Sequence, residues 1–261
     1  MRSAISKHEQ DIQSAVSLRG TVSVAELSQM LGVSDQTIRR IVKPMVARGE
    51  VTKVHGAIVS TTSPTDPPFQ TRMNANRAAK VAIANHVADL VPDGAALAID
   101  TGSTSGFVAQ ALRRRRNLTV VTNSAFIAST LSMIDGNRTF MAGTQLRNHD
   151  GAAFDRAAFE VIAGLSVDIT ILSASLVHPE RGFLAYDQCE IDIARAMMQI
   201  SQRNIMAVDA SKFVEHGRKP ALRLPQLMPG DIVVTDRQPS SRFATLLEGL
   251  SLRVASESQP R

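Results

Sequence analysis

One short stretch decides how the N-terminal part of the chain folds, and it reads Ser34-Asp35-Gln36-Thr37-Ile38-Arg39-Arg40. Ser34 is a favourable N-cap because its hydroxyl can accept hydrogen bonds from the free N–H groups of a first helical turn. Apolar residues then recur at the spacing of one helix face, at Ile38, Ile41, Val42 and Met45. The stretch therefore predicts a helix that begins after Ser34 and buries one face.

The opposite face of this helix carries hydrogen-bond donors and positive charge, at Gln36, Arg39, Arg40 and Lys43. Arg and Gln reach base edges, and Lys and Arg reach phosphates, so such a face suits double-stranded DNA. The alternative is a solvated face on an ordinary three-helix bundle. Pro44 lies inside the span and lacks a backbone donor, so we expect a kink or an early end near Lys43.

The flanking sequence favours DNA binding. Ser23 and Glu26 match a capping box, which predicts a second helix that ends near the turn residue Gly32. After the Ser34 helix, residues 50–59 have the pattern of two short strands that turn at His55-Gly56. A β-hairpin beside a helix-turn-helix is a wing, so residues 1–60 are predicted to form a winged helix-turn-helix domain. The residues predicted to contact operator DNA are Ser34, Gln36, Thr37, Arg39, Arg40, Lys43, Lys53 and His55.

The distribution of charge agrees with an anionic partner for this domain. The chain of 261 residues has a formal net charge of +5. Residues 1–60 hold eight Lys and Arg against five Asp and Glu, so most of the excess lies in the first quarter of the sequence.

Cysteine usage and hydropathy indicate where the protein works. Cys189 is the only cysteine, which excludes an intrachain disulfide and suits a reducing compartment. The N-terminus is charged and has no apolar leader, and no apolar run is long enough to span a bilayer. We expect a soluble, cytoplasmic protein that does not contact the membrane.

A second domain follows a connector rich in Ser, Thr and Pro, which we place at residues 61–74. In residues 75–261, short apolar strands alternate with helices, which predicts an α/β domain with a mostly parallel sheet. The strands are expected at residues 97–99, 118–121, 139–141, 168–172, 204–208 and 231–234, and the helices at 77–90, 107–112, 125–131 and 189–201.

Small and polar residues follow these strands, at the edge where open α/β sheets bind ligands. The stretch Gly102-Ser103-Thr104-Ser105 precedes a helix, where backbone N–H groups, hydroxyls and the helix dipole favour a phosphate. Lys212 can add a positive charge, and the other polar strand ends can bind sugar hydroxyls. A phosphorylated sugar or polyol fits this set, although Gly, Ser and Thr are also common in turns and caps.

Two other sequence features are explained by local structure without a binding or catalytic role. The run Arg113-Arg114-Arg115-Arg116 falls at a helix C-terminus, where cations complement the dipole. His149-Asp150 has no nucleophile predicted beside it, so a loop contact is favoured over an acid/base pair. No metal-ligand spacing is present, and we expect neither a metal nor another cofactor.

The chain resembles the DeoR family of bacterial transcriptional regulators over nearly its whole length. In the first domain the matching residues are Val33-Ser34, Thr37-Ile38-Arg39-Arg40, Gly49 and Val54-His55-Gly56-Ala57. In the second they are Lys80, Asp100-Thr101-Gly102-Ser103-Thr104, Thr122-Asn123, Gly143, Leu146-Arg147, Gly151, Asp209-Ala210-Ser211-Lys212-Phe213 and Thr235-Asp236.

The resemblance implies a winged helix-turn-helix joined to a sensor domain with the fold of ribose-5-phosphate isomerase. It also implies a repressor of a carbohydrate-use operon that a phosphorylated sugar releases from DNA, and a homodimer or homotetramer. The residues predicted to bind the effector are Lys80, Asp100, Gly102, Ser103, Thr104, Ser105, Asn123, Gly143, Asp209 and Lys212. We expect no catalysis; the alternative is a sugar-phosphate isomerase or deaminase with an added DNA-binding domain, for which the sequence shows no clear acid/base pair.

Overall fold

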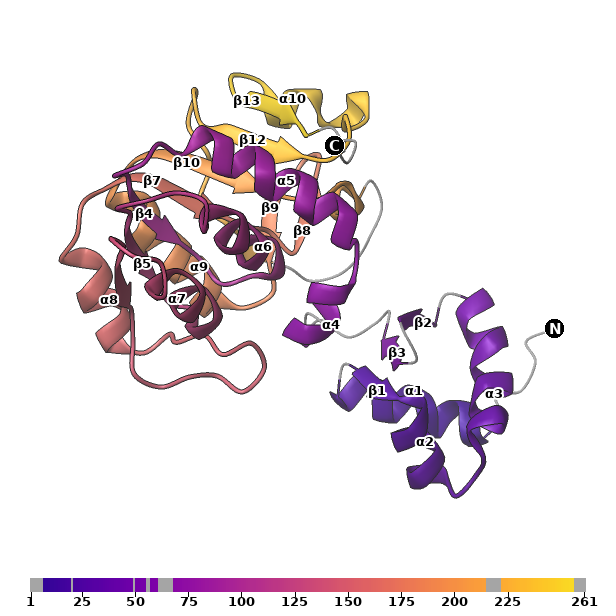
Figure 1. Ribbon diagram of the computed structural model, residues 1–261. Helices are drawn as coiled ribbons and strands as arrows, with labels where there is room; N and C mark the ends of the chain where they lie inside the picture. Colours follow the sequence, from indigo (N-terminus) through magenta and orange to yellow (C-terminus); the bar gives the residue numbers. More distant parts are fainter. Residues whose placement is uncertain are drawn as a thin grey trace. The chain divides into compact units, whose positions relative to one another are not determined.

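The computed structural model describes residues 7–19, 21–48, 50–54, 57–60, 68–214 and 222–255. The chain divides into two compact units, Met1–Ala75 and Asn76–Arg261 (Figure 1). Within the described residues, no helix is both long and apolar enough to cross a membrane.

The N-terminal unit is a helical core closed by a small sheet. Its helices are α1 (Lys7–Arg19), α2 (Val24–Leu31), α3 (Asp35–Ala47) and α4 (Phe69–Asn74). Its strands are β1 (Thr21–Ser23), β2 (Val51–Val54) and β3 (Ala57–Ser60), which form an antiparallel sheet in the order β1-β3-β2. The predicted winged helix-turn-helix order of elements is confirmed.

Local signals and apolar burial together fix the first three helices. Ser23 accepts from the N–H of Glu26, and the Glu26 carboxylate accepts from the N–H of Ser23, so the predicted capping box is present. Gly32 ends α2 at φ 64°, a left-handed conformation that glycine adopts without steric cost. Ile38, Val42 and Met45 of α3 are fully or almost fully buried in the core of this unit.

Of the two alternatives expected near Lys43, a kink or an early end, the early end is wrong. The helix continues through Pro44 to Ala47, and the N–H of Arg48 bonds to the carbonyl of Pro44 at 3.0 Å. Met45, directly after the proline, has no exposed surface. Burial of a side chain of this size stabilises by about 1.5–3 kcal/mol, which offsets the missing hydrogen bond of the proline.

The structure corrects the predicted connector in part, and some of the predicted loop residues lie outside the described ranges. The turn at His55-Gly56 and residues 61–67 of the connector lie outside the described residues. Residues 69–74, which we expected to belong to the connector, form helix α4.

The second unit is built on a seven-stranded parallel sheet. Its strands are β4 (Ala96–Ile99), β5 (Thr119–Thr122), β6 (Arg138–Met141), β7 (Val167–Leu172), β10 (Ser201–Ala207), β12 (Ile232–Thr235) and β13 (Ser251–Val254). Their order is β13-β12-β10-β7-β4-β5-β6, and every neighbouring pair is parallel. The predicted α/β class with a mostly parallel sheet is confirmed.

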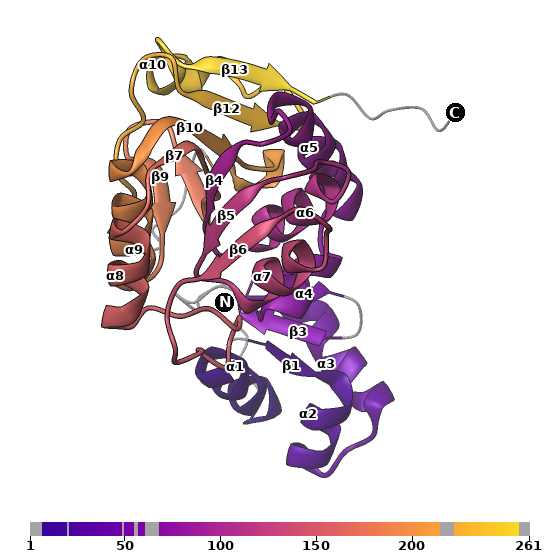
Figure 2. The ribbon, with the colours of Figure 1, turned by 60° about the vertical axis from the view of Figure 1, so that its left-hand side comes forward.

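Helices cover both faces of this sheet (Figure 2). On one face lie α5 (Arg77–Leu90), α6 (Ser103–Leu112) and α7 (Ala125–Ser132). On the other lie α8 (Arg156–Ala163) and α9 (Gln188–Gln199), where Ile162, Ile193 and Met197 pack in one cluster with Ala98 and Val121. Because both faces are covered, the central strands are apolar along their length, which made them recognisable in the sequence.

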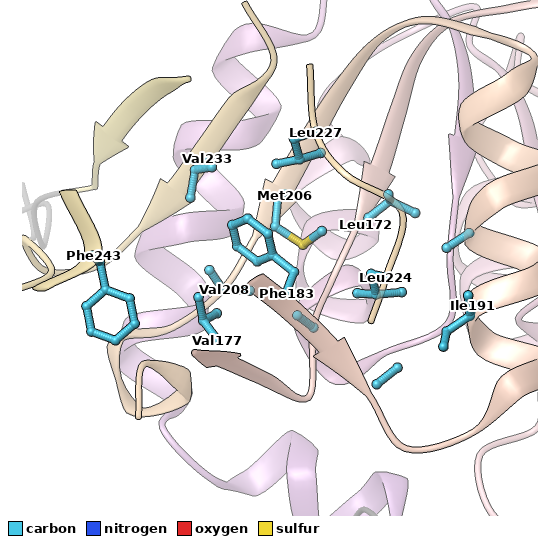
Figure 3. Close-up of a cluster of buried hydrophobic side chains, with 13 residues drawn as sticks. Leu172, Val177, Phe183, Ile191, Met206, Val208, Leu224, Leu227, Val233 and Phe243 are labelled. Carbon is cyan, nitrogen blue, oxygen red and sulfur yellow. The ribbon is translucent and has the colours of Figure 1, made fainter. Parts of the chain in front are cut away.

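A second, three-stranded sheet extends the core on one side. It consists of β8 (Leu176–His178), β9 (Gly182–Ala185) and β11 (Leu222–Arg223) in the antiparallel order β11-β9-β8. Phe183 of β9 and Met206 of β10 belong to the buried cluster of Figure 3, together with Val177 and Phe243. Phe243 also meets Phe213 edge to face, with ring centroids 5.0 Å apart. The short helices η1 (Ala210–Lys212), η2 (Ser241–Phe243) and α10 (Ala244–Leu247) complete the unit.

The loop that follows β6 is held by Asp155, the N-cap of α8. One carboxylate oxygen accepts from the N–H of Ala158 at 3.0 Å, and the other accepts from those of Thr144 and Gln145 at 2.8 and 2.7 Å. The bonds from Gln145 and Thr144 lower the pKa of Asp155 to about 2. The ionised carboxylate therefore joins the start of α8 to the residues after Gly143.

We expect Met45→Ala to destabilise the N-terminal unit by about 2–5 kcal/mol, because it leaves a cavity in the core. The matched control is Val46, the next residue along α3, because its side chain is 37% exposed. Val46→Ala should change stability by no more than about 0.5 kcal/mol. Urea denaturation followed by circular dichroism measures both, and equal losses would contradict the assigned orientation of α3.

We expect Asp155→Asn to lower the melting temperature near neutral pH, because the amide cannot replace a carboxylate that accepts several N–H groups. The folded-state pKa of about 2 lies below the ordinary 3.8, so this stabilisation is complete above 3.8 and is lost as pH falls towards 2. The difference between wild type and variant should therefore narrow across that window in thermal melts. Asp135→Asn, at an exposed turn residue, removes the same charge and should show no such trend.

Candidate DNA-binding helix and ligand-binding strand ends

Helix α3 presents the predicted DNA-contacting residues to solvent. Its N-cap Ser34 accepts from the N–H of Thr37 at 3.3 Å, and the two hydroxyls lie 3.0 Å apart. The side chains on the outer face are all exposed, namely Gln36, Arg39, Arg40 and Lys43. Lys53 is exposed on β2, and His55 lies outside the described residues. One face of the helix is therefore fixed in the core while the cationic face is available to a partner.

An ionic brace that the sequence did not reveal fixes the end of α3. The Arg48 guanidinium, at the C-cap, donates twice to Glu50 at 2.8 and 2.9 Å and once to Glu9 of α1 at 2.8 Å. The bond from Arg48 holds the pKa of the Glu50 carboxyl below its ordinary value. Because Glu50 directly precedes β2, these ion pairs connect the end of α3 to the start of the wing.

In the second unit, the strand order brings the polar strand ends to one edge. β5 and β6 extend the sheet on one side of β4, whereas β7 returns to its other side. The direction of winding thus reverses between β4 and β7, and ligands of open α/β sheets bind at such a point, outside the carboxyl ends of the strands. Asp100 follows β4, and Ser173 follows β7.

Asp100 joins these two strand ends. One carboxylate oxygen accepts from the Ser105 hydroxyl at 2.5 Å, and the other accepts from the N–H of Ser173 at 2.9 Å. A side chain at Gly102 would collide with the Ser173 hydroxyl, so the loop passes close to β7. Ser105 is fully buried, and its bond to Asp100 indicates that it shapes the loop.

The start of α6 has the features of an anion site. Its N-cap Gly102 has no side chain to cap the helix, and the first backbone bond across the turn runs from the N–H of Gly106 to the carbonyl of Gly102. The N–H groups of Ser103 and Thr104 therefore precede the helical hydrogen-bond ladder. Both side chains are mostly buried, which shields an anion there from water.

Asn123 fastens the loop after Gly143 to the end of β5. Its amide nitrogen donates to the carbonyl of Ala153 at 3.1 Å, and its backbone carbonyl accepts from the N–H of Ala153 at 2.8 Å. Gly143 has φ 100°, and a side chain there would collide with Ala153. Only glycine fits this close approach, which explains the residue at this strand end.

Several buried polar atoms at this edge have no hydrogen-bond partner among the described residues. They are Thr101 Oγ1, Asn123 Oδ1, Asp209 Oδ2 and Thr235 Oγ1, from the ends of β4, β5, β10 and β12. A buried polar atom without a partner costs about 1–3 kcal/mol, so such atoms are expected to bond to water or a ligand.

The remaining predicted effector residues lie around β10. Asp209 is almost completely buried, and its other oxygen accepts from the N–H and hydroxyl of Ser211 at 3.1 and 2.5 Å. Lys212 is half-buried in η1, and Lys80 of α5 is 2% exposed. Lysine is rarely buried to this extent, which makes Lys80 a notable residue in this unit.

Arg147 is the centre of an ion cluster that sequence reasoning missed. It binds Asp150, Asp187 and Glu190 at 2.6, 2.8 and 2.9 Å. Burial raises the pKa of Asp150, but the hydrogen bond and charge of Arg147, the N–H of Ala152 and the charge of His149 together outweigh burial and leave that pKa below its ordinary value. Asp150 is thus a structural anion, as the loop-contact interpretation predicted. Burial also raises the pKa of the nearby Cys189 thiol.

The arginine run has a capping role, on a neighbouring helix. Arg114 donates to the carbonyl of Asn85 at 2.8 Å, and Arg115 donates to that of Ala88 at 2.9 Å. The Ala88 carbonyl lies in the last turn of α5, so Arg115 caps that helix, while Arg114 binds one turn earlier. Arg113 and Arg116 are exposed.

Comparisons with known proteins agree with both halves of this description. Residues 9–64 match the DeoR-like helix-turn-helix domain, and residues 75–237 match the DeoR C terminal sensor domain. The chain is 33% identical over 224 residues to the glycerol-3-phosphate regulon repressor of Escherichia coli (strain K12), covering 86% of this chain and 88% of that protein. It is 29% identical over 231 residues to the transcriptional repressor AccR of Agrobacterium fabrum, covering 88% of each.

Among solved structures, ribose 5-phosphate isomerase A from Methanocaldococcus jannaschii aligns with 54% of this chain and 56% of its own, at 16% identity and a TM-score of 0.41. The two domain matches together span most of the chain. The protein therefore belongs to the DeoR family of helix-turn-helix transcriptional regulators.

Proposed function

We propose that this protein is a repressor of a carbohydrate-use operon that leaves its operator when a phosphorylated sugar or polyol binds the sensor unit. The observation that carries the proposal is the presence, in one chain, of an exposed cationic helix face and a sheet edge with buried polar atoms that lack partners. The relatives named above are repressors, which supports repression over activation as the role of this protein.

The DNA-binding role is assigned to α3 and the wing. Gln36, Thr37 and Arg40 read base edges, whereas Arg39 and Lys43 bind phosphates. Ser34 orients the first turn, and Lys53 and His55 contact the backbone beside the helix. Because its operator DNA lies in the cytoplasm, we place the protein in that compartment. A homodimer or homotetramer would present two recognition helices to an operator with a repeated sequence.

The effector role is assigned to the strand ends around β4. The phosphate lies at the N–H groups and hydroxyls of Ser103 and Thr104, where the helix dipole of α6 favours an anion. Lys80 and Lys212 supply positive charge. Asn123 and Asp209 bind hydroxyls through their unpaired oxygens, while Asp100, Gly102, Ser105 and Gly143 hold the loops in shape.

An isomerase or deaminase is the second candidate function, and the contacts argue against it. The carboxylates of Asp100 and Asp150 accept hydrogen bonds that organise loops. A general base needs a proton of the substrate within reach. The Asp209 carboxylate, whose Oδ2 has no partner among the described residues, is assigned here to the ligand hydroxyls. We therefore assign binding without catalysis, and no metal or cofactor.

Arg40→Ala and Lys43→Ala should each weaken binding to the DNA upstream of the gene by about 5- to 150-fold, because each removes a contact to a base or phosphate. Loss of a phosphate contact should also lower the slope of log Kd against log salt by about 1. Fluorescence anisotropy at several salt concentrations measures both quantities.

Arg156→Ala is the charge-matched control, since this exposed arginine lies on α8 of the other unit. Its Kd for DNA should equal that of wild type. If Arg40→Ala and Lys43→Ala bind as tightly as this control, α3 is not the recognition helix.

Phosphorylated compounds should raise the melting temperature of the full chain, while their unphosphorylated forms should not. A ligand at 100 times its Kd stabilises the folded state by about 2.7 kcal/mol. The panel is glycerol 3-phosphate, ribose 5-phosphate and glucosamine 6-phosphate, each beside its free sugar or polyol. Lys212→Met should abolish the shift, whereas Lys43→Met should keep it.

Two results would overturn this assignment. Stabilisation by the free compounds alone would show that the site does not recognise phosphate. Turnover of ribose 5-phosphate or glucosamine 6-phosphate, followed by chromatography of the products, would favour the enzyme instead.

A further inference from the structure

We propose that Asn76 is the positioning residue through which the ligand site controls the DNA-binding unit. The inference rests on the proposed function and assigns a route for its regulation. Asn76 is the first residue of the second unit, directly after Ala75, the last residue of the first. The backbone torsions at this junction set the direction in which the chain passes from α4 to α5.

The backbone of Asn76 adopts a conformation that most residues avoid. Its φ and ψ are 50° and 39°, in the left-handed region, whereas the preceding Ala75 is extended. Among the described residues, Asn76 and Asn117 are the non-glycine residues with positive φ. A residue held in this region needs surrounding contacts that fix it.

Those contacts come from the predicted ligand site. The Asn76 amide makes no cap for α5. It donates instead to Asp209 Oδ1 at 3.1 Å and to the Ser211 hydroxyl at 2.8 Å. Ser211 and Lys212 both belong to η1, and Asp209 is its N-cap, so a phosphate bound by Lys212 acts on the segment that holds Asn76.

A second contact links the junction to the other predicted anion-binding segment. The guanidinium of Arg77 lies 5.5 Å from the centre of the Phe107 ring. Phe107 is on α6, one turn after Ser103. The first two residues of the second unit therefore contact both segments that are assigned to the phosphate.

The Asn76 amide also has free space beside it, so it can change its hydrogen-bond partners. A pocket of about 490 Å³ adjoins these contacts, and its lining includes Asn76, Arg77, Asp209 and Ser211. A close-packed core would resist a shift of the amide, but an open pocket lets it exchange one partner for water. The segment after β10 can thus take a ligand-bound arrangement that no longer holds Asn76 in the same way.

The physical requirement for such control is a difference in ligand affinity between two arrangements. In one, Asp209 and Ser211 bind Asn76 and the chain direction at the junction is fixed. In the other, they bind the ligand and the junction is released. Loss of the Asn76 side chain should therefore separate ligand binding from its effect on DNA.

The test is Asn76→Gly, which keeps the left-handed backbone accessible and removes the amide. The two measured quantities are the melting-temperature shift caused by glycerol 3-phosphate, ribose 5-phosphate and glucosamine 6-phosphate, and the Kd for upstream DNA with and without each compound. Wild type should show a Kd ratio of about 5- to 150-fold for one of them. Asn76→Gly should keep the melting shift while the ratio falls towards 1.

Two further variants separate side chain from backbone. Asn117→Gly makes the same change at the other left-handed asparagine and should behave as wild type. Ser211→Ala leaves the junction backbone untouched but removes one acceptor of the amide, so its Kd ratio should lie between wild type and Asn76→Gly.

The outcomes distinguish this inference from the proposed function. If no phosphorylated compound changes the wild-type Kd, the proposed function fails and the role of Asn76 fails with it. If wild type responds and Asn76→Gly responds equally, the function stands and Asn76 does not transmit it. If Asn76→Gly loses the melting shift as well, the residue belongs to the ligand site and the coupling role is wrong.

Discussion

The carboxylate of Asp100 makes the contact on which the rest of the sensor unit depends. It accepts from the Ser105 hydroxyl and from the N–H of Ser173, and so ties α6 and the end of β7 to the end of β4. These are the segments on either side of the point where the sheet reverses its winding. That carboxylate therefore fixes the first turn of α6 beside the sheet edge where open α/β sheets bind ligands.

Ligand recognition and DNA recognition make opposite demands on the chain. The recognition helix is braced at both ends, by the Ser34 cap and by the Arg48 ion pairs, and its inner face is buried. The strand ends instead keep buried polar atoms that find no partner within the part of the chain that the structure describes, which is costly unless water or a ligand satisfies them. A regulator controlled by a ligand is expected to join a rigid DNA-binding helix to a binding site whose polar atoms still need partners.

Features coded by neighbouring residues were predictable from the sequence, and features that need distant residues were not. The capping box of Ser23 and Glu26 spans three residues, and the central strands are apolar because both faces are covered. The Asn76–Asp209 bond joins residues 133 apart, so no local pattern signals it. β13 is partly exposed, and β8 and β9 form a short hairpin, so neither gave a clear strand pattern. At Pro44 the local rule was misleading, because burial of Met45 keeps the helix intact.

The strand order also constrains how the protein folds during its synthesis on the ribosome. β4, β5 and β6 leave the ribosome first, but β4 pairs on its other side with β7, whose residues 167–172 come about seventy residues later. Until then Leu97, Ala98 and Ile99 present a bare apolar strand edge, the kind of surface on which nascent chains aggregate. A premature stop between β6 and β7 would yield an incomplete sheet with its centre exposed, so such fragments should be cleared by proteases rather than persist as partial sensors.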